Sequence, residues 1–138
     1  MSAIDRVIDV GDGQPVVMLH GLGGFKEIWT PQVKYLSEHG LRSLAVDLRG
    51  HGSAPDIEPG WRLRDVAADV LEILQDRDVV DPIIVGHSFG GRVMFQTAVL
   101  WPERLRGLVA VGAQSASPSG AYRSVLKDVA TATAARIE

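Results

Sequence analysis

A serine between closely spaced glycines is the most chemically specific feature of the sequence. The segment Gly86-His87-Ser88-Phe89-Gly90 has the pattern G-x-S-x-G, directly after the apolar run 83–85 and directly before the largely apolar segment 91–101. In a tight strand-to-helix turn, flanking glycines leave room for a strained backbone that presents the serine hydroxyl at the end of the strand. The pattern and its context predict Ser88 as a nucleophile, and the alternative is a tight turn that merely contains a serine.

A second glycine-rich segment, His20-Gly21-Leu22-Gly23-Gly24, follows the apolar run 16–19. Preorganised backbone N–H groups stabilise the negative charge that develops on a carbonyl oxygen during acyl transfer. We predict that the N–H groups of Leu22 and Phe89 form such an oxyanion hole, because Phe89 also lies at the N-terminal end of a predicted helix, whose dipole favours an anion. Phosphate binding is the alternative for these glycines, but their spacing does not fit G-x-G-x-x-G and no P-loop lysine follows.

A serine nucleophile also needs a base, and histidine is the usual one. The chain has four histidines and all of them precede Ser88: His20, His39, His51 and His87. We take His20, which borders the glycine-rich loop, as a tentative substitute base and His51 as the second candidate, against the alternative that each is hydrogen-bonded within its loop. For His51 and for Asp47, in the turn-rich segment 47–53, bracing of the loop is the favoured interpretation. Phe25 is a tentative substrate-binding residue, with core packing as the alternative.

Alternating strand and helix patterns position these residues. Four short apolar runs bounded by turn residues read as strands buried on both faces: 16–19, 43–46, 83–85 and 108–111. Strands that alternate with helices indicate an α/β fold of three layers, with a mostly parallel sheet and helices on both faces. The segment 4–10 alternates in polarity and ends at Gly11-Asp12-Gly13, so we expect an antiparallel edge strand followed by a hairpin.

Four helices are expected between and after these strands. Thr30 as N-cap, Pro31 at the first helical position and Gly40 as the stop delimit the first helix. The second has an apolar stripe at helical spacing over 63–74. The third, 91–101, is apolar nearly all round and therefore central, and Pro102 ends it. A fourth is predicted over 122–136.

Composition and charge exclude several classes of function. The 138 residues are 46% hydrophobic, enough for the core of one domain, and contain no cysteine for thiol chemistry. The 14 Lys and Arg against 17 Asp and Glu give a net charge of -3, which argues against nucleic-acid or anionic-membrane partners. No apolar run approaches the roughly 20 residues that span a bilayer, and the first residues do not resemble a secretory signal. We therefore expect a cytoplasmic protein that needs no metal and no cofactor.

Four segments in the same order carry a family resemblance: HGLGG at 20–24, DLRGHGSA at 47–54, GHSFGG at 86–91 and WPERLRGLVAVGA at 101–113. In these segments the chain resembles the N-terminal half of α/β-hydrolase fold proteins of the esterase, lactonase and cofactor-free haloperoxidase type. The resemblance implies an α/β-hydrolase core and an acyl-serine intermediate on Ser88. A serine at position 88 is similar to the esterase-like branches, whereas dehalogenases and epoxide hydrolases have aspartate there.

The resemblance is incomplete beyond the nucleophile. In the family the triad runs Ser, then Asp or Glu, then His, yet no histidine follows Ser88 in this chain. We therefore expect a single domain over 1–138 that is a truncated core lacking the C-terminal strands and the cap. In such a core the predicted strand 108–111 lies at the sheet edge, where an unpaired apolar strand favours association. We expect a homo-oligomer through this edge or through the helix 122–136.

The sequence thus predicts a hydrolase of small carboxylic esters or lactones with an incomplete or non-standard triad. Two alternatives remain. One is a catalytically impaired fragment or pseudoenzyme that acts through association, and the other is a cofactor-free perhydrolase that shares Ser88 but uses peroxide in place of water.

Overall fold

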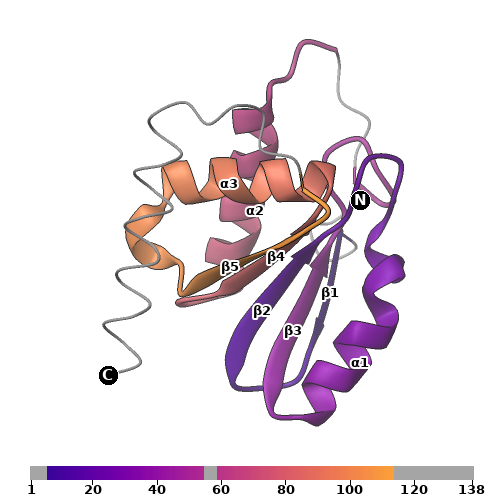
Figure 1. Ribbon diagram of the computed structural model, residues 1–138, viewed down its shortest axis with the longest axis vertical. Helices are drawn as coiled ribbons and strands as arrows, with labels where there is room; N and C mark the ends of the chain where they lie inside the picture. Colours follow the sequence, from indigo (N-terminus) through magenta and orange to yellow (C-terminus); the bar gives the residue numbers. More distant parts are fainter. Residues whose placement is uncertain (1–5, 55–58, 114–138) are drawn as a thin grey trace.

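A five-stranded sheet forms the centre of the structure (Figure 1). The computed structural model describes residues 6–54 and 59–113. The strands are β1 (Val7–Val10), β2 (Gln14–Leu19), β3 (Leu41–Val46), β4 (Ile83–His87) and β5 (Gly107–Val111). They lie in the order β1-β3-β2-β4-β5, with β2 to β5 parallel and only β1 antiparallel to its neighbour. The predicted mostly parallel sheet is confirmed.

The first strand lies at the predicted edge, but the predicted hairpin is wrong. β1 pairs antiparallel with β3, Val7 opposite Val46, and not with β2, which follows it in the chain. Both edges of β2 are taken by β3 and β4, so β1 has to pass to the far side of β3. Gly11 and Gly13, with φ of 88° and 110°, allow the sharp turn that redirects the chain.

Helices cover both faces of the sheet, as expected. One face is covered by α1 (Thr30–Glu38), which follows the 3-10 turn η2 (Lys26–Trp29), and Val33 of α1 packs with Val16, Met18 and Ala45. The other face is covered by α2 (Leu63–Asp76) and α3 (Phe89–Leu100), and that side holds the larger core. The short turn η3 (Pro102–Arg104) then leads from α3 to β5.

The predicted helices differ from the observed ones mainly at their N-termini. The N-cap of α1 is Trp29, one residue before the predicted Thr30, whose hydroxyl instead donates to the Glu27 carbonyl of the preceding turn. α3 begins at Phe89, two residues before the predicted start, because Ser88 itself makes the turn. The stripe of α2 and the stop at Gly40, with φ of 78°, are confirmed. The predicted helix 122–136 lies outside the described residues.

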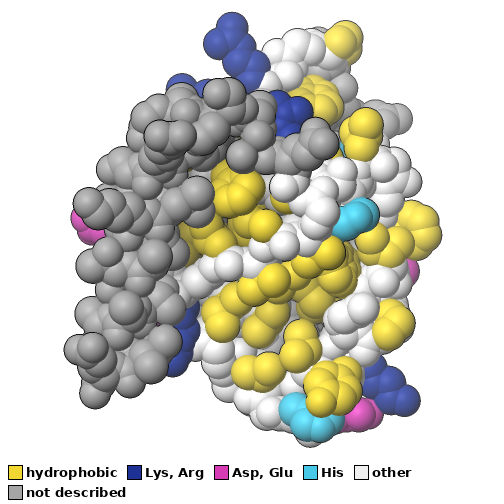
Figure 2. Space-filling view, in the orientation of Figure 1, with side chains coloured by type: hydrophobic (Ala, Val, Ile, Leu, Met, Phe, Trp, Pro, Cys, Tyr) yellow, Lys and Arg dark blue, Asp and Glu magenta, His cyan; other side chains and the backbone are white. Residues whose placement is uncertain are grey.

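Hydrophobic side chains lie open on the α1 side of β4 and β5 (Figure 2). Val109 pairs with Val85, which packs on the α1-side core, so Val109 and Val111 point to that same face. They are 46% and 44% exposed. No strand pairs with the outer edge of β5 among the described residues. In that part of the chain, no helix combines the length and hydropathy needed to cross a membrane.

Candidate active site

Ser88 occupies a strained turn between β4 and α3. Its φ of 51° and ψ of -114° lie in a region that residues other than glycine rarely adopt, at a cost of about 1–3 kcal/mol. The Ser88 N–H donates to the Val111 carbonyl at 3.1 Å, and the Ser88 carbonyl accepts the Gly91 N–H at 2.9 Å. Hydrogen bonds to β5 and to α3 therefore hold this conformation from both sides.

Two glycines let α3 begin in close contact with the sheet. A Cβ atom on Gly86 would lie 2.6 Å from the Gly90 carbonyl oxygen. A Cβ atom on Gly90 would lie 2.5 Å from the His20 carbonyl oxygen, at the end of β2. Side-chain carbons do not approach backbone atoms so closely in proteins, so both positions require glycine. The spacing of the G-x-S-x-G pattern thus follows from the packing of α3 on β2 and β4.

The glycine-rich loop after β2 lies against Ser88. A Cβ atom on Gly21 would be 3.4 Å from the Ser88 Cβ, and the loop closes as a turn in which the Gly24 N–H donates to the Gly21 carbonyl at 3.0 Å. Within residues 6–54 and 59–113, neither the Leu22 N–H nor the Phe89 N–H has a hydrogen-bond partner. Phe89 is the first residue of α3, where an N–H has no intrahelical acceptor. The two segments that meet at Ser88 thus each carry one backbone donor without a partner in the described part of the chain.

The His20 ring is buried and hydrogen-bonded to the backbone on both sides. The side chain is fully buried, and its Nε2 accepts the Leu48 N–H at 3.0 Å while its Nδ1 donates to the Gly21 carbonyl at 2.7 Å. Burial lowers the pKa of His20 below the ordinary histidine value, which further favours the neutral ring. A base needs a ring nitrogen that faces the serine, and both nitrogens of His20 are engaged with the backbone. With both nitrogens engaged, His20 is not available as a base in this arrangement.

Asp47 organises the loop that follows β3. Its buried carboxylate accepts the Lys26 N–H at 2.6 Å and the Ser53 N–H at 2.8 Å, and it pairs with the Lys26 ammonium at 2.9 Å. Burial alone raises the pKa of Asp47, but the hydrogen bonds from Ser53 and Lys26 outweigh it and leave the pKa below its usual value. Asp47 thus orders a turn, as favoured from the sequence.

His51 connects the two loops. Its Nε2 accepts the Gly23 N–H at 2.9 Å, and its Nδ1 lies 3.0 Å from the Arg49 carbonyl. The ring is tilted against that of His20 at 5.0 Å between centroids, and it lies nearly parallel to the Phe89 ring at 6.4 Å. These contacts agree with loop bracing, the interpretation favoured for His51.

The other two histidines differ in environment. His39 stacks on Tyr35 at the end of α1, with its Nδ1 2.6 Å from the Tyr35 carbonyl. His87 is exposed at the end of β4, and a Cβ atom on Gly21 would lie 3.1 Å from its Nδ1. In the described part of the chain, neither ring nitrogen of His87 has a hydrogen-bond partner. His87 is therefore the one described histidine with both ring nitrogens available.

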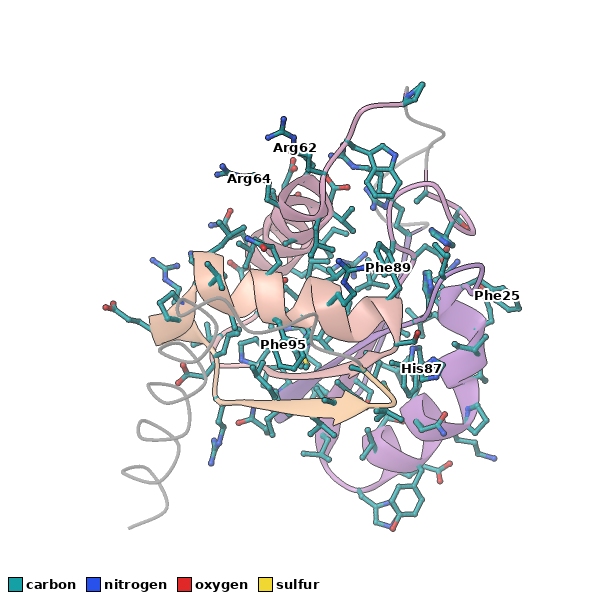
Figure 3. The ribbon with its side chains drawn as sticks, turned by 45° about the horizontal axis from the view of Figure 1, so that its top comes forward. Phe25, Arg62, Arg64, His87, Phe89 and Phe95 are labelled. Atoms are coloured by element: carbon teal, nitrogen blue, oxygen red, sulfur yellow. The ribbon has the colours of Figure 1, made fainter. Side chains whose placement is uncertain are left out.

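The two candidate aromatic residues lie in different surroundings (Figure 3). Phe89 extends from the start of α3 and packs on the larger core. Phe25 is 46% exposed and projects outward beside the start of α1. A substrate-binding role for Phe25 remains a prediction, and core packing, its alternative, does not fit this exposure.

Two contacts of the site were missed from the sequence. Lys26, beside the exposed Glu27, is only 8% exposed and pairs with Asp47, a contact that its position in the sequence does not indicate. The hydrogen bond between Gly23 and His51 joins residues 28 positions apart and has no local signal. For the described residues, no group of three or more His, Cys, Asp or Glu side chains could hold a metal ion.

The chain is similar to known proteins in sequence. The family model for the alpha/beta hydrolase fold matches residues 14–135. A putative carbamate hydrolase, RutD, from Variovorax paradoxus is 40% identical over 105 residues, which are 75% of this chain and 40% of that protein. Other relatives with lower identity are named as haloperoxidases and epoxide hydrolases.

Solved structures agree in the fold. An esterase from Exiguobacterium antarcticum is 34% identical with a TM-score of 0.71, covering 78% of this chain and 40% of that one. The N-acyl homoserine lactonase AidH, solved with N-butanoyl homoserine, is 31% identical with a TM-score of 0.71 and the same coverage. The chain spans about 40% of the length of these relatives. From the strained serine, the glycine loop beside it and these matches together, the chain belongs to the α/β-hydrolase fold family.

Proposed function

We propose that this chain supplies the nucleophile and the oxyanion hole of a serine hydrolase for small carboxylic esters or lactones. The observation that carries the proposal is the strained Ser88, with a φ of 51°, beside two segments whose Leu22 and Phe89 N–H groups have no partner among the described residues. Strain at a non-glycine residue is costly, and it recurs where function requires it. The esterase and lactonase relatives support the choice of substrate class.

The proposed reaction has two steps. The Ser88 Oγ bonds to the carbonyl carbon, its proton passes to a base, and the carbonyl oxygen becomes negative while facing the Leu22 and Phe89 N–H groups. The intermediate then breaks the bond to the alcohol oxygen, which leaves with a proton. Water hydrolyses the acyl-serine ester in the second step and restores the hydroxyl.

The proposal also requires a proton acceptor for Ser88. No histidine follows it in the sequence, and both His20 and His51 have their ring nitrogens engaged. Among the described residues, the His87 ring nitrogens have no hydrogen-bond partner and Nδ1 lies beside Gly21, so His87→Gln is the variant to compare. A loss of activity in this variant supports His87 as the acceptor, and unchanged activity excludes it.

The direct test is hydrolysis of p-nitrophenyl butyrate and of a butyryl lactone by the purified chain, Ser88→Ala and the control Ser37→Ala. Ser37 lies on α1, and its hydroxyl donates to the Lys34 carbonyl. We expect Ser88→Ala to fall to the background rate and Ser37→Ala to keep the rate of the parent. A fluorophosphonate adduct on Ser88, seen as a mass increase that Ser88→Ala lacks, provides a readout independent of the substrate. Equal rates in the parent and Ser88→Ala contradict the proposal.

A second candidate function is association with another copy of the chain. The observation that favours it is the apolar face of β4 and β5, with Val109 and Val111 nearly half exposed, next to an outer strand edge without a described partner. Light scattering after gel filtration measures the mass in solution, and Val109→Lys is expected to shift a dimer to the monomer. A monomeric parent at all concentrations contradicts this function.

The perhydrolase alternative, in which peroxide replaces water, is tested by halogenation assays on the parent, Ser88→Ala and Ser37→Ala.

A further inference from the structure

A single neutral histidine connects the glycine-rich loop to the loop after β3. Because the Gly23 N–H donates to His51 Nε2 at 2.9 Å, that nitrogen carries a lone pair and the proton of the ring is on Nδ1. The Nδ1–H then donates to the Arg49 carbonyl at 3.0 Å. His51 therefore makes both hydrogen bonds only in the neutral form of one tautomer.

The Gly23 hydrogen bond acts next to the proposed oxyanion donors. Gly23 follows Leu22 directly, and its φ of 77° makes it the turning point of the loop. Gly23 is exposed, and a Cβ atom built on it would meet nothing within 4 Å apart from its chain neighbours. The His51 ring also lies nearly parallel to the Phe89 ring. One side chain thus contacts both segments that carry the proposed donors.

The loop that carries His51 is itself fixed. Asp47 binds Lys26 and the Ser53 N–H, as described above, and the Arg49 guanidinium makes two hydrogen bonds of 2.7 Å to the Asp69 carboxylate on α2. The His51 N–H donates to the Leu48 carbonyl at 2.9 Å. The loop after β3 thus has several fixed points that do not involve the His51 ring, so we expect a change at this ring to act mainly on the glycine-rich loop.

Among residues 6–54 and 59–113, few charged groups lie around His51. On the β2 side it faces His20, whose ring is neutral, and the Asp47–Lys26 pair lies within the same loop structure. Arg49 is turned to Asp69 on α2, and the neighbour on α3 is the uncharged Phe89. These described charged groups are thus paired with one another and none of them forms an ion pair with the His51 ring.

We propose that His51 is a positioning residue that holds the oxyanion loop in place when neutral and releases it when protonated. This inference rests on the proposed function, because it assigns the loop a role in stabilising the oxyanion. In the protonated ring Nε2 becomes a donor that faces the Gly23 N–H, so the hydrogen bond is lost and two donors oppose each other. Removal of one oxyanion donor typically costs about 10²–10³-fold in kcat. We expect a smaller loss, about 10-fold to 100-fold, because the loop is displaced and the donor remains.

The test follows the Gly23 amide by NMR and the hydrolysis rate by kinetics, both as a function of pH. Labelling with ¹⁵N-glycine gives signals from the 15 glycines, and Gly23→Ala assigns the one that disappears. His51→Gln keeps an amide oxygen that accepts from Gly23 and does not titrate. His39→Gln is the matched control, since His39 stacks on Tyr35 at the end of α1.

The expected result has two parts. In the parent the Gly23 amide shift moves together with the protonation of the His51 ring, and in His51→Gln it is constant while the hydrolysis rate is retained at lower pH. His39→Gln behaves as the parent. A Gly23 signal that does not change as the His51 ring is protonated refutes the link, and this result does not depend on the folding of His51→Gln. If the hydrolysis rate falls at low pH in the same way in the parent and in His51→Gln, protonation of His51 has no effect on activity and that part of the proposal is refuted. Absence of hydrolysis dependent on Ser88 refutes the proposed function, and the Gly23 titration still decides the link.

Discussion

Gly90→Ala is the sharpest test of how α3 meets the sheet. The added methyl would lie 2.5 Å from the His20 carbonyl oxygen and 2.6 Å from the Leu19 carbonyl carbon, whereas ordinary contacts begin at 3.4 Å. Both neighbours are backbone atoms at the end of the central strand β2, so no side-chain rotation relieves the overlap. The start of α3 has to move away by roughly 1 Å, a repacking to which overpacked cores respond with a loss of typically 1–3 kcal/mol.

The magnitude follows from opposing contributions. Alanine favours a helix over glycine by about 1 kcal/mol, so part of the overlap energy is offset. The distances from the added methyl are among the shortest for the glycines of this chain, and the atoms it meets are backbone atoms that cannot rotate away. We therefore expect the free energy of unfolding to fall by about 2–3 kcal/mol. A displacement of about 1 Å at the Phe89 N–H also lowers hydrolysis roughly 100-fold under the proposed function.

The assay is urea unfolding followed by circular dichroism, with Gly107→Ala as the matched control. Gly107 lies on β5, and the nearest atom to a Cβ there is an Ile83 side-chain carbon at 3.9 Å, so this variant is expected to match the parent within about 0.5 kcal/mol. Equal stabilities of Gly90→Ala and Gly107→Ala refute the close approach of α3 to β2.

Three further variants or conditions have expected outcomes. Ser88→Gly relieves the φ of 51° and is expected to raise the free energy of unfolding by about 1 kcal/mol in urea titrations while abolishing hydrolysis. Lys26→Met leaves the fully buried Asp47 without its ion-pair partner, so the melting curve should show a loss of about 3 kcal/mol. Acid should destabilise the parent: hydrogen bonds from Arg42, against the cost of burial, hold the pKa of Asp9 below its ordinary value, and the balance at Asp47 has the same sign. This stabilisation is complete when the pH is above the unfolded-state pKa, and it is lost as the pH falls through the lowered folded-state pKa. At pH values under about 4 the urea concentration at the unfolding midpoint should therefore decrease, and it should decrease less in Asp9→Asn.

Local patterns determined what the sequence could predict of the fold. The apolar stripe of α2 repeats along its own segment, and the turn at Ser88 is encoded by glycines within two residues of it. The pairing of β1 was not predictable in this way. Its partner depends on both neighbours of β2, and one of these, β4, lies far downstream in the chain.

The same distinction applies to the site. Ser88 and the two candidate donors follow from motifs in single segments, and the structure brings those segments together. Lys26 and the ring contacts of His51 depend on side chains from separate loops, which spacing does not reveal. His20 illustrates the limit, because its place beside the glycine loop suggested a base, and only its two backbone partners identify it as structural.

The strand order has a consequence for the chain as it is synthesised. The central strand β2 can pair with β3 soon after both leave the ribosome. Its other edge stays unpaired until β4 is made, because Leu19 pairs with Gly86, about 67 residues later in the chain. At roughly 5–20 residues per second, ribosomes leave this apolar edge uncovered for about 3–13 seconds. An open edge of this kind invites pairing with other chains, so the nascent protein is expected to need chaperone protection there. Ser88 takes its place only when β4 closes that edge, so the site is among the last parts of the sheet to form.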